Sequence, residues 1–387
     1  MKLPAHRNFG AMLFILRAIC VCVLFGILVA GLWPFHAPRN DVHWSDRGTD
    51  QGSDRGGLVF GKHGSIVTER SFEPLASHGD SSCSVEIWLQ PERSNSSGTI
   101  LAFYQPVRQV IPFALRQSLG DLVVVRNGQN HLDRRNRVYI NEVFTSAKPV
   151  LITVTSSDTV TSIYRDGVLI KKVSTFKVSS GDLTGQLVLG NAPNTNNSWS
   201  GQLNGLAIYD RELLPAEVLQ HFHEKADDRA NKSTSNIVDN ELIADYRFNE
   251  GQGSIVHSAV RSAPSLLIPQ RFFVLHQPFL ERPWDEFRPD WNYWQDVAVN
   301  IFGFIPFGFF FRAYFSLSRK IRRATALTIA FGFAISLTIE VSQAFMPTRD
   351  SGMTDLINNT LGTALGALLF AWVMKRDWFA RAVFTTA

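Results

Sequence analysis

The sequence contains few cysteines and none of the short motifs that identify common enzyme classes. Only three of its 387 residues are cysteine: Cys20 and Cys22 lie inside an apolar run, and Cys83 stands alone in the middle of the chain. This arrangement excludes a framework of disulfide bridges, and we expect Cys83 to be buried and inert. The chain also lacks an HExxH, GxSxG or P-loop motif and any Cys/His spacing typical of a zinc site. Enzyme mechanisms that depend on these motifs are therefore not indicated.

The net charge is also small, at +4. The basic residues gather beside apolar runs, where membrane topology places them, so the charge does not indicate a nucleic-acid partner. The chain is instead rich in apolar residues: 45% are hydrophobic, 12% are aromatic and 29 are phenylalanine. A chain of this length that is so apolar at its ends is predicted to combine a membrane part with a chemically different second part.

Four apolar runs are long enough to cross a lipid bilayer, whose hydrocarbon core of about 30 Å requires roughly 20 helical residues. They cover residues 11–33, 296–315, 324–345 and 355–374. We interpret 11–33, interrupted only by Arg17, as a retained first transmembrane helix. A cleaved signal peptide is the alternative, although the run is long for a signal core and no clear small-x-small cleavage site follows it.

The basic residues predict the direction of these spans, because they gather on the cytoplasmic side of a membrane. They precede the first run and follow the second and fourth: Lys2, Arg7, Arg319, Lys320, Arg322, Arg323, Lys375, Arg376 and Arg381. We therefore expect a multi-pass protein of the plasma (inner) membrane with both termini cytoplasmic. The region between the first two spans is then extracytoplasmic.

That region changes to a hydrophobic period of two, with short β-branched and aromatic runs between turn residues, which is typical of an antiparallel sandwich. Asp166-Gly167 predicts a hairpin turn, and Leu214–Phe222 predicts a helix. A late run at 242–253 predicts a strand that closes the sheet. The other predicted strands cover residues 84–89, 99–104, 122–125, 151–155, 161–165, 168–173, 186–189 and 203–209.

The predicted fold is therefore multidomain, with a β-sandwich inserted into a four-span α-helical membrane bundle. The first transmembrane helix covers 11–33 and the sandwich covers 57–255. A juxtamembrane linker follows at 256–295, where tryptophan and tyrosine suit the lipid headgroup region. The remaining three spans cover 296–374. Asp41–Gly57, rich in Asp, Gly, Ser and Arg, is predicted to be a linker or surface loop.

Polar residues gather where the apolar runs of the last three spans meet. Glu340 and Gln343 share a helix face with Ser336, at spacings of i, i+4 and i+7. Ionisable groups inside a membrane span cost a few kcal/mol or more unless they are paired or hydrated. Several at one depth therefore predict a shared polar pocket. Its candidate residues are Asp296, Asn300, Glu340, Gln343, Arg349, Asp350, Asp355, Asn358 and Asn359.

Three interpretations of this pocket remain open. Arg349 and the carboxylates could bind the phosphate or sugar headgroup of an envelope lipid. Paired carboxylates could instead hold a divalent cation or act as acid and base, with Glu340 the best candidate. The network could also serve only to fasten the helices together. Four glycines in the same spans are predicted to allow close helix packing: Gly303, Gly308, Gly362 and Gly366.

Two parts of the chain resemble known families. The stretches SVEIWLQP, IYRDGVLI, LVLGN and WSGQLNGLAIYDRELLPAEVLQHF are similar to the concanavalin A-like, laminin-G-type jelly roll over roughly residues 57–222. This resemblance implies a domain that binds carbohydrate or a protein partner, in some members through calcium. Calcium in the sandwich is thus the cofactor that this resemblance suggests. Asn204 stands where such domains often carry an acidic residue.

The stretches DVAVNIFGFIPFGFFF, SLTIEVSQ and RDSGMTDLINNTLGTALG resemble the VanZ-like family, named for a protein associated with glycopeptide (teicoplanin) resistance. By this resemblance the candidate residues occupy that family's motif positions, the last of which falls on Asn358 or Asn359. The resemblances imply a bacterial envelope protein whose outer domain binds glycan or a wall or protein partner. Its bundle would bind a lipid headgroup at the outer leaflet or serve a resistance role. The alternative is a membrane enzyme acting on lipid-linked glycan precursors with Glu340 as acid/base; the missing motifs favour a protein without enzymatic activity.

Overall fold

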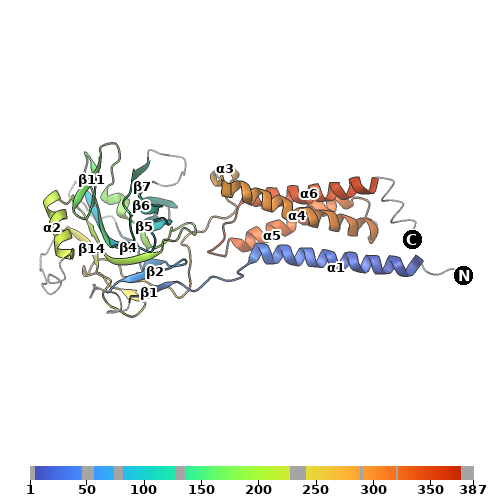
Figure 1. The fold of residues 1–387 in the computed structure, drawn as a ribbon, viewed down its shortest axis with the longest axis horizontal. Coiled ribbons are helices and arrows are strands. Elements are labelled where there is room, and N and C mark those ends of the chain that lie inside the picture. The colour runs from blue at the N-terminus through green and yellow to red at the C-terminus, as the bar shows by residue number, and fades with distance from the viewer. Residues whose placement is uncertain are drawn as a thin grey trace. The chain divides into compact units, whose positions relative to one another are not determined.

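The computed structural model describes residues 5–45, 56–73, 82–127, 136–226, 241–287, 291–319 and 321–375. The chain divides into two compact units (Figure 1). The helical unit combines the two ends of the chain, Met1–His36 and Gln277–Ala387, and the β unit comprises Ala37–His276. Four of the basic residues used to predict topology lie outside the described residues: Lys2, Lys320, Arg376 and Arg381. So does most of the predicted linker, residues 46–55.

The β unit is an antiparallel sandwich of two sheets. Within the described residues, eight strands form each sheet. The first has the order β1-β2-β13-β4-β9-β10-β11, with β14 paired to β13. Its strands are β1 (Val42–Trp44), β2 (Leu58–Phe60), β4 (Cys83–Pro91), β9 (Val150–Ser156), β10 (Thr161–Arg165), β11 (Val168–Val173), β13 (Gly201–Tyr209) and β14 (Leu242–Tyr246).

The second sheet has the order β15-β16-β3-β12-β5-β6-β7-β8. Its strands are β3 (Ile66–Thr68), β5 (Ser97–Gln105), β6 (Val110–Ser118), β7 (Asp121–Arg126), β8 (Arg137–Ile140), β12 (Gln186–Leu189), β15 (Ile255–Val256) and β16 (Leu266–Leu267). A turn of 3-10 helix at Ser180–Leu183 precedes β12. The core between the sheets contains the fully buried Trp199, Phe60, Phe103 and Phe113.

Strand β4 shows why these residues form a sandwich. Alternate side chains of a strand point to opposite faces, so Val85, Ile87 and Leu89 enter the core between the sheets. Cys83 is 2% exposed, and burial raises the pKa of its thiol. The prediction of a buried, unreactive cysteine is consistent with both observations.

Helix α2 (Pro215–Ala226) is held to the outer face of the first sheet by a buried carboxylate. Glu86 of β4 is fully buried and accepts hydrogen bonds from Thr153 Oγ1 at 3.1 Å and Tyr209 Oη at 3.3 Å. From α2, His221 Nδ1 lies 3.0 Å from Oε2 of Glu86, and Lys225 Nζ lies 3.7 Å from it. The predicted helix at 214–222 thus forms, and Glu86 ties it to the sheet.

The compact β unit is larger than the predicted sandwich of residues 57–255. At its start, β1 lies in the segment predicted as a linker and pairs with β2. At its end, β15 and β16 join the second sheet through β3, although residues 256–295 were predicted to be a juxtamembrane linker. The predicted turn at Asp166-Gly167 is present, with φ of 52° and 79°. The structure therefore places the borders of the β unit at Ala37 and His276.

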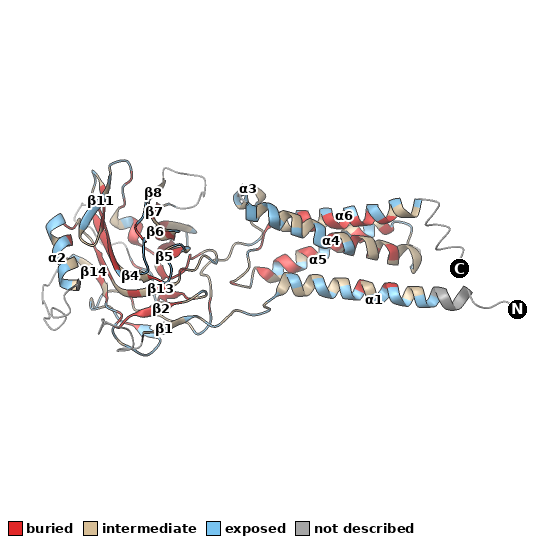
Figure 2. Ribbon diagram, viewed as in Figure 1, coloured by how far each residue is buried: buried red, intermediate tan, exposed pale blue. Residues whose placement is uncertain are grey.

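The helical unit contains four helices that are long and apolar enough to cross a membrane. They are α1 (Ala5–Leu32), α4 (Trp291–Leu317), α5 (Ala324–Gln343) and α6 (Met353–Lys375); the short α3 (Pro283–Glu286) precedes α4. Figure 2 shows that buried positions concentrate on α5 and α6, whereas much of α1 is exposed or intermediate. An apolar surface of this kind suits contact with lipid.

Three of the four predicted packing glycines allow α4 and α6 to approach closely. A Cβ atom on Gly308 would lie 2.0 Å from the carbonyl oxygen of Thr363, and one on Gly362 would lie 2.2 Å from that of Ile301. A Cβ atom on Gly366 would lie 2.0 Å from the Ile305 oxygen. Gly303 differs, because no atom lies within 4 Å of its Cβ position. Close packing of backbones through small residues is common between membrane helices.

Candidate functional site

The polar residues of the helical unit meet where α5 ends and where α4 and α6 begin. Each helix brings an apolar face to the bundle, and its polar positions fall within one or two turns of this end. Ser336 and Glu340 of α5 are 0% and 1% exposed, and Asn359 of α6 is 4% exposed. Such residues rarely lie fully buried unless they are paired or bonded.

Two carboxylates bind the N-terminus of α6. Oε2 of Glu340 accepts a hydrogen bond from the Gly352 N–H at 2.9 Å, and Oε2 of Glu286, on α3, accepts one from the Thr354 N–H at 3.1 Å. The first N–H groups of a helix have no partner within the helix, and the helix dipole favours negative charge there. Glu340 and Glu286 therefore complete and stabilise the start of α6.

The same end of the bundle is strongly acidic. Burial raises the pKa of Glu286, and the neighbouring carboxylates of Asp350 and Asp285 raise it further, against the opposing hydrogen bond from Thr354. Glu340 also lies close enough to Asp355 and Glu286 for their like charges to repel. A positively charged or hydrogen-bond-donating group would relieve this repulsion.

Two side-chain hydrogen bonds connect α6 to its neighbours. Asn300 Nδ2, on α4, donates to Oδ1 of Asp355 at 2.6 Å. Asn359 Nδ2 donates to the hydroxyl of Ser336, on α5, at 3.0 Å. Both bonds join residues predicted to share a pocket, and amide-mediated bonds of this type contribute about 1 kcal/mol each between membrane helices.

Arg349 and Gln343 bind the C-terminal carbonyl groups of α1. The Arg349 guanidinium donates to the Trp33 oxygen at 3.1 and 2.8 Å and to the Ala30 oxygen at 3.4 Å. Gln343 Nε2 donates to the Gly31 oxygen at 2.8 Å. Because the last carbonyl groups of a helix have no partner within it, a cation and an amide at this position stabilise the end of α1.

Several buried amide atoms at this end have no hydrogen-bond partner among the described residues. They are Nδ2 of Asn358, Oδ1 of Asn359 and Oε1 of Gln343. These residues are 8%, 4% and 7% exposed. A buried polar atom without a partner costs about 1–3 kcal/mol, so such atoms in a folded protein point to an additional binding partner or water.

The candidate residues thus occupy several different settings. The start of α6 carries Asp355, Asn358 and Asn359, and Asn300 and Glu340 lie beside it. The end of α1 is bound by Gln343 and Arg349. Asp296 and Asp350 are exposed. Within the part of the chain that is described, no group of three or more His, Cys, Asp or Glu residues is arranged to hold a metal ion, in either unit.

Sequence reasoning missed contributions from the segment that precedes α4. Gln277 Nε2 donates to the carbonyl groups of Gln343 and Met346, at 3.1 and 2.6 Å, and to that of Arg349. Glu286 was missed because it lies in a four-residue helix within a segment predicted to be a linker. The sequence PWDE, with proline followed by two acidic residues, was the one local sign of a helix start there.

Family models match both units. The model described as VanZ/LLP1 matches residues 243–374, and the model described as the concanavalin A-like lectin/glucanases superfamily matches residues 61–219. Both resemblances inferred from the sequence are therefore confirmed. None of the curated proteins compared with the chain matches it.

Three solved structures illustrate the likeness of the sandwich. The binding domain of Paraclostridial Mosquitocidal Protein 1 is 16% identical, with 49% of this chain and 47% of that chain covered and a TM-score of 0.35. A SAP-like pentraxin from Limulus polyphemus is 17% identical (46% and 81% covered, TM-score 0.31). The receptor binding domain of botulinum neurotoxin D is 13% identical (49% and 52% covered, TM-score 0.33). The chain spans about half the length of the first and third.

Proposed function

This chain joins a VanZ-like region to a concanavalin A-like domain, and we propose that it is a bacterial cell-envelope membrane protein that binds a lipid headgroup in its helical unit. The headgroup site is the polar cluster at the start of α6. The observation that carries the proposal is a pair of buried amide atoms, Asn358 Nδ2 and Asn359 Oδ1, one turn after the carboxylate of Asp355. Neither atom has a hydrogen-bond partner in the part of the chain that the structure describes.

The charges at this end favour a headgroup that offers hydroxyl or amine groups over a bare phosphate. The acidic residues Glu286, Glu340 and Asp355 would repel a phosphate. Arg349, which the sequence suggested as the phosphate ligand, directs its hydrogen bonds to the main-chain carbonyl groups of Trp33 and Ala30. Sugar hydroxyls or an ammonium group can donate to carboxylates and to the Asn359 oxygen, and hydroxyls can accept from Asn358.

Two other interpretations account for less of the site. Fastening of the helices explains Glu340, Gln343 and Arg349, whose bonds hold the ends of α1 and α6. It leaves Asn358 Nδ2 and Asn359 Oδ1 without a hydrogen-bond partner among the described residues. Catalysis with Glu340 as acid/base requires that carboxylate to reach a substrate. Oε2 of Glu340 already has a structural role, because it accepts the Gly352 N–H at the start of α6.

We expect Asn358→Leu to abolish headgroup binding without loss of stability, because its Nδ2 atom makes no bond within the described protein. Native mass spectrometry of the full chain would measure binding of phosphatidylethanolamine, an undecaprenyl-linked sugar and phosphatidic acid. The first two should bind more tightly than phosphatidic acid. Thermal unfolding in detergent should be unchanged or slightly raised in the variant, since a buried amide without a partner is removed.

The matched control is Leu361→Ala, which alters a 46% exposed position of the same helix and should bind as the unmodified protein does. Equal binding of the three lipids, or a loss of stability with unchanged binding in Asn358→Leu, would contradict the headgroup site and favour a fastening role. If the protein converted a labelled lipid-linked precursor and Glu340→Gln lost this activity, the result would instead support a membrane enzyme with Glu340 as acid/base.

The proposed topology places the sandwich outside the cytoplasm and both termini inside, in the plasma membrane. It is supported by the basic residues described after α4 and at the end of α6, which include Arg319, Arg322, Arg323 and Lys375. Alkaline phosphatase fused after Asp80 should be active, whereas alkaline phosphatase fused after Lys320 or Arg376 should be inactive. Green fluorescent protein fused after Lys320 or Arg376 should be fluorescent. The reverse pattern would place the acidic end of the bundle on the cytoplasmic side.

A second candidate function belongs to the sandwich, which we propose binds glycan or another wall or protein component. It is favoured by the match of residues 61–219 to a superfamily of lectins and glucanases. In this arrangement the helical unit anchors a glycan-binding domain to the membrane. The glycopeptide-resistance role implied by the VanZ-like resemblance would follow if the bound headgroup belongs to a lipid-linked wall precursor.

A further inference from the structure

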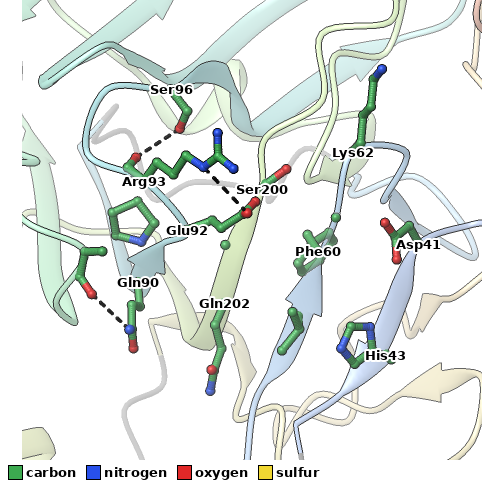
Figure 3. Close-up of a pocket in the computed structure, with 15 residues that line it drawn as sticks. Asp41, His43, Phe60, Lys62, Gln90, Glu92, Arg93, Ser96, Ser200 and Gln202 are labelled. Atoms are coloured by element: carbon green, nitrogen blue, oxygen red, sulfur yellow. Dashed lines mark hydrogen bonds and ion pairs between the residues drawn. The ribbon is translucent and has the colours of Figure 1, made fainter.

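An open groove with a volume of about 700 Å³ crosses one end of the first sheet. Figure 3 shows that its side chains come from β1, β2 and β13, from the end of β4, and from the loop that follows β4. We infer that this groove binds an uncharged saccharide chain. The inference rests on the proposed glycan binding by the sandwich and assigns that function to a particular surface.

The register of the strands aligns four side chains along the groove. His43 of β1 pairs with Val59 of β2, Val59 pairs with Gln202 of β13, and Gln202 pairs with Gln90 of β4. Their strand neighbours Leu58, Phe60, Leu203 and Leu89 belong to the core between the sheets. Because side chains alternate along a strand, this row lies on the outer face. Three strand spacings of about 4.8 Å make the row roughly 14 Å long, which suits several linked sugar rings better than a single one.

The row offers the hydrogen-bonding groups that sugar hydroxyls require. Gln90 and Gln202 each carry an amide with both donor and acceptor atoms, which matches the donor and acceptor character of a hydroxyl group. Gln90 Nε2 donates to the Ala147 oxygen at 3.0 Å, and Gln202 Nε2 donates to Asn204 Oδ1 at 2.7 Å. These bonds hold both amides in place and leave their oxygen atoms with accepting capacity for a ligand.

An apolar side chain lies between the polar ones. Val59 stands between His43 and Gln202 in the row, whereas Pro91 and Phe60, which also line the groove, are buried and Phe60 belongs to the core. Sugar rings combine hydroxyl edges with apolar C–H faces, so a surface that alternates amides and apolar side chains is complementary to them. Pockets for small ligands generally combine such an apolar lining with a few placed polar groups.

The charges along the groove balance, which favours an uncharged ligand. Lys62 and Arg93 contribute two positive charges, and Asp41 and Glu92 contribute two negative ones. Arg93 and Glu92 face each other at 3.9 Å. An acidic polysaccharide would meet as many repulsive as attractive groups, so it would gain little long-range attraction.

The test is binding of the full chain in detergent to cellohexaose, chitohexaose, maltohexaose and a hyaluronan hexamer, measured by calorimetry. At least one neutral hexamer should bind, and Gln90→Ala with Gln202→Ala should weaken it by about tenfold or more, as expected from the loss of two ligand hydrogen bonds. Gln220→Ala is the matched control. Gln220 is exposed on α2 and bonds only to Glu224 in the described chain, so its loss should leave affinity unchanged.

Each other outcome is distinct. If a neutral hexamer bound the double variant as tightly as the unmodified protein, the assignment of the ligand to this groove would be wrong. Glycan binding elsewhere on the sandwich would then be supported. Binding of hyaluronan without binding of any neutral hexamer would contradict the inference that the ligand is uncharged. Absence of binding to all four sugars would contradict both the groove and glycan binding by the sandwich. Unfolding of the double variant, followed by circular dichroism, should match that of the unmodified protein, since both side chains lie on the outer face of their strands.

Discussion

Replacing Gly366 with leucine should prevent the helical unit from folding. A Cβ atom at this position would lie 2.0 Å from the Ile305 oxygen and 2.8 Å from the Phe309 nitrogen, both of them backbone atoms of α4. Backbone atoms of a helix cannot move aside individually, so α4 and α6 would have to separate. Overpacking a core typically costs about 1–3 kcal/mol, and overlap with a backbone should exceed that range. We expect the variant to accumulate poorly in membranes and to aggregate on extraction into detergent.

Gly303→Leu is the matched control for this substitution, because Gly303 is exposed on α4 and has no atom within 4 Å of its Cβ position. It should accumulate and unfold as the unmodified protein does, measured by size-exclusion chromatography and thermal unfolding in detergent. If Gly366→Leu behaved like Gly303→Leu, then the close contact between α4 and α6 would not be required. Equal damage from both would indicate a general intolerance of bulk in these helices.

The sequence predicted most of the long elements because their hydrophobic periods are strong. The apolar runs correspond to α1, α4, α5 and α6. Eight of the nine predicted strands lie within strands of the sandwich, and the ninth, at 242–253, begins with β14 but extends beyond it. Strand β6 was missed because Pro112 interrupts it, and proline normally excludes a central strand. The structure accommodates Pro112 where the register between β5 and β6 shifts, between Phe103 and Gln105. Strands of two or three residues, such as β1 and β15, are too short to show a period at all.

The sequence indicated which helices contribute polar residues to this end of the helical unit, but not the bonds that these residues make. Helical spacing correctly places Ser336 and Glu340 on one face of α5, and their partners Asn359 and Gly352 follow from the meeting of α5 and α6. The spacing of polar residues cannot reveal that Arg349 bonds to main-chain carbonyl groups. Every residue carries such a carbonyl group, and it becomes available as an acceptor only where a helix ends. The contributions of Gln277 and Glu286 come from irregular chain, where no period exists to predict them.

Replacing Glu86 with alanine should release α2 from the sandwich. The fully buried carboxylate accepts hydrogen bonds from Thr153, Tyr209 and His221, and the Lys225 ammonium lies 3.7 Å away. Removing one member of a buried charged network costs about 3–5 kcal/mol when the remaining partners stay buried. Here His221 and Lys225 are partly exposed and can regain water, so about 2–3 kcal/mol is expected. Hydrogen–deuterium exchange should rise across residues 215–226.

The same carboxylate predicts how the sandwich responds to acid. Burial alone would raise the pKa of Glu86, but Lys225 and the hydrogen bonds from His221 and Thr153 outweigh it and hold the pKa at about 2, against an ordinary 4.5. A depressed pKa stabilises the folded state above the unfolded pKa, and this stability, about 3 kcal/mol, is lost as pH falls from about 4.5 toward 2. Protection of α2 against exchange should therefore fall over that range in the unmodified protein.

The variant Glu86→Gln keeps the shape of the side chain but cannot titrate, so its protection of α2 should be lower at neutral pH and nearly independent of pH between 4.5 and 2. Glu224→Gln, an equivalent change at an exposed position of the same helix, should keep the pH response of the unmodified protein. An identical acid response in Glu86→Gln and the unmodified chain would show that other carboxylates control this transition. Because the Lys225 ammonium and the His221 ring of one helix both lie beside Glu86, its charge rather than its shape should hold α2 against the sheet.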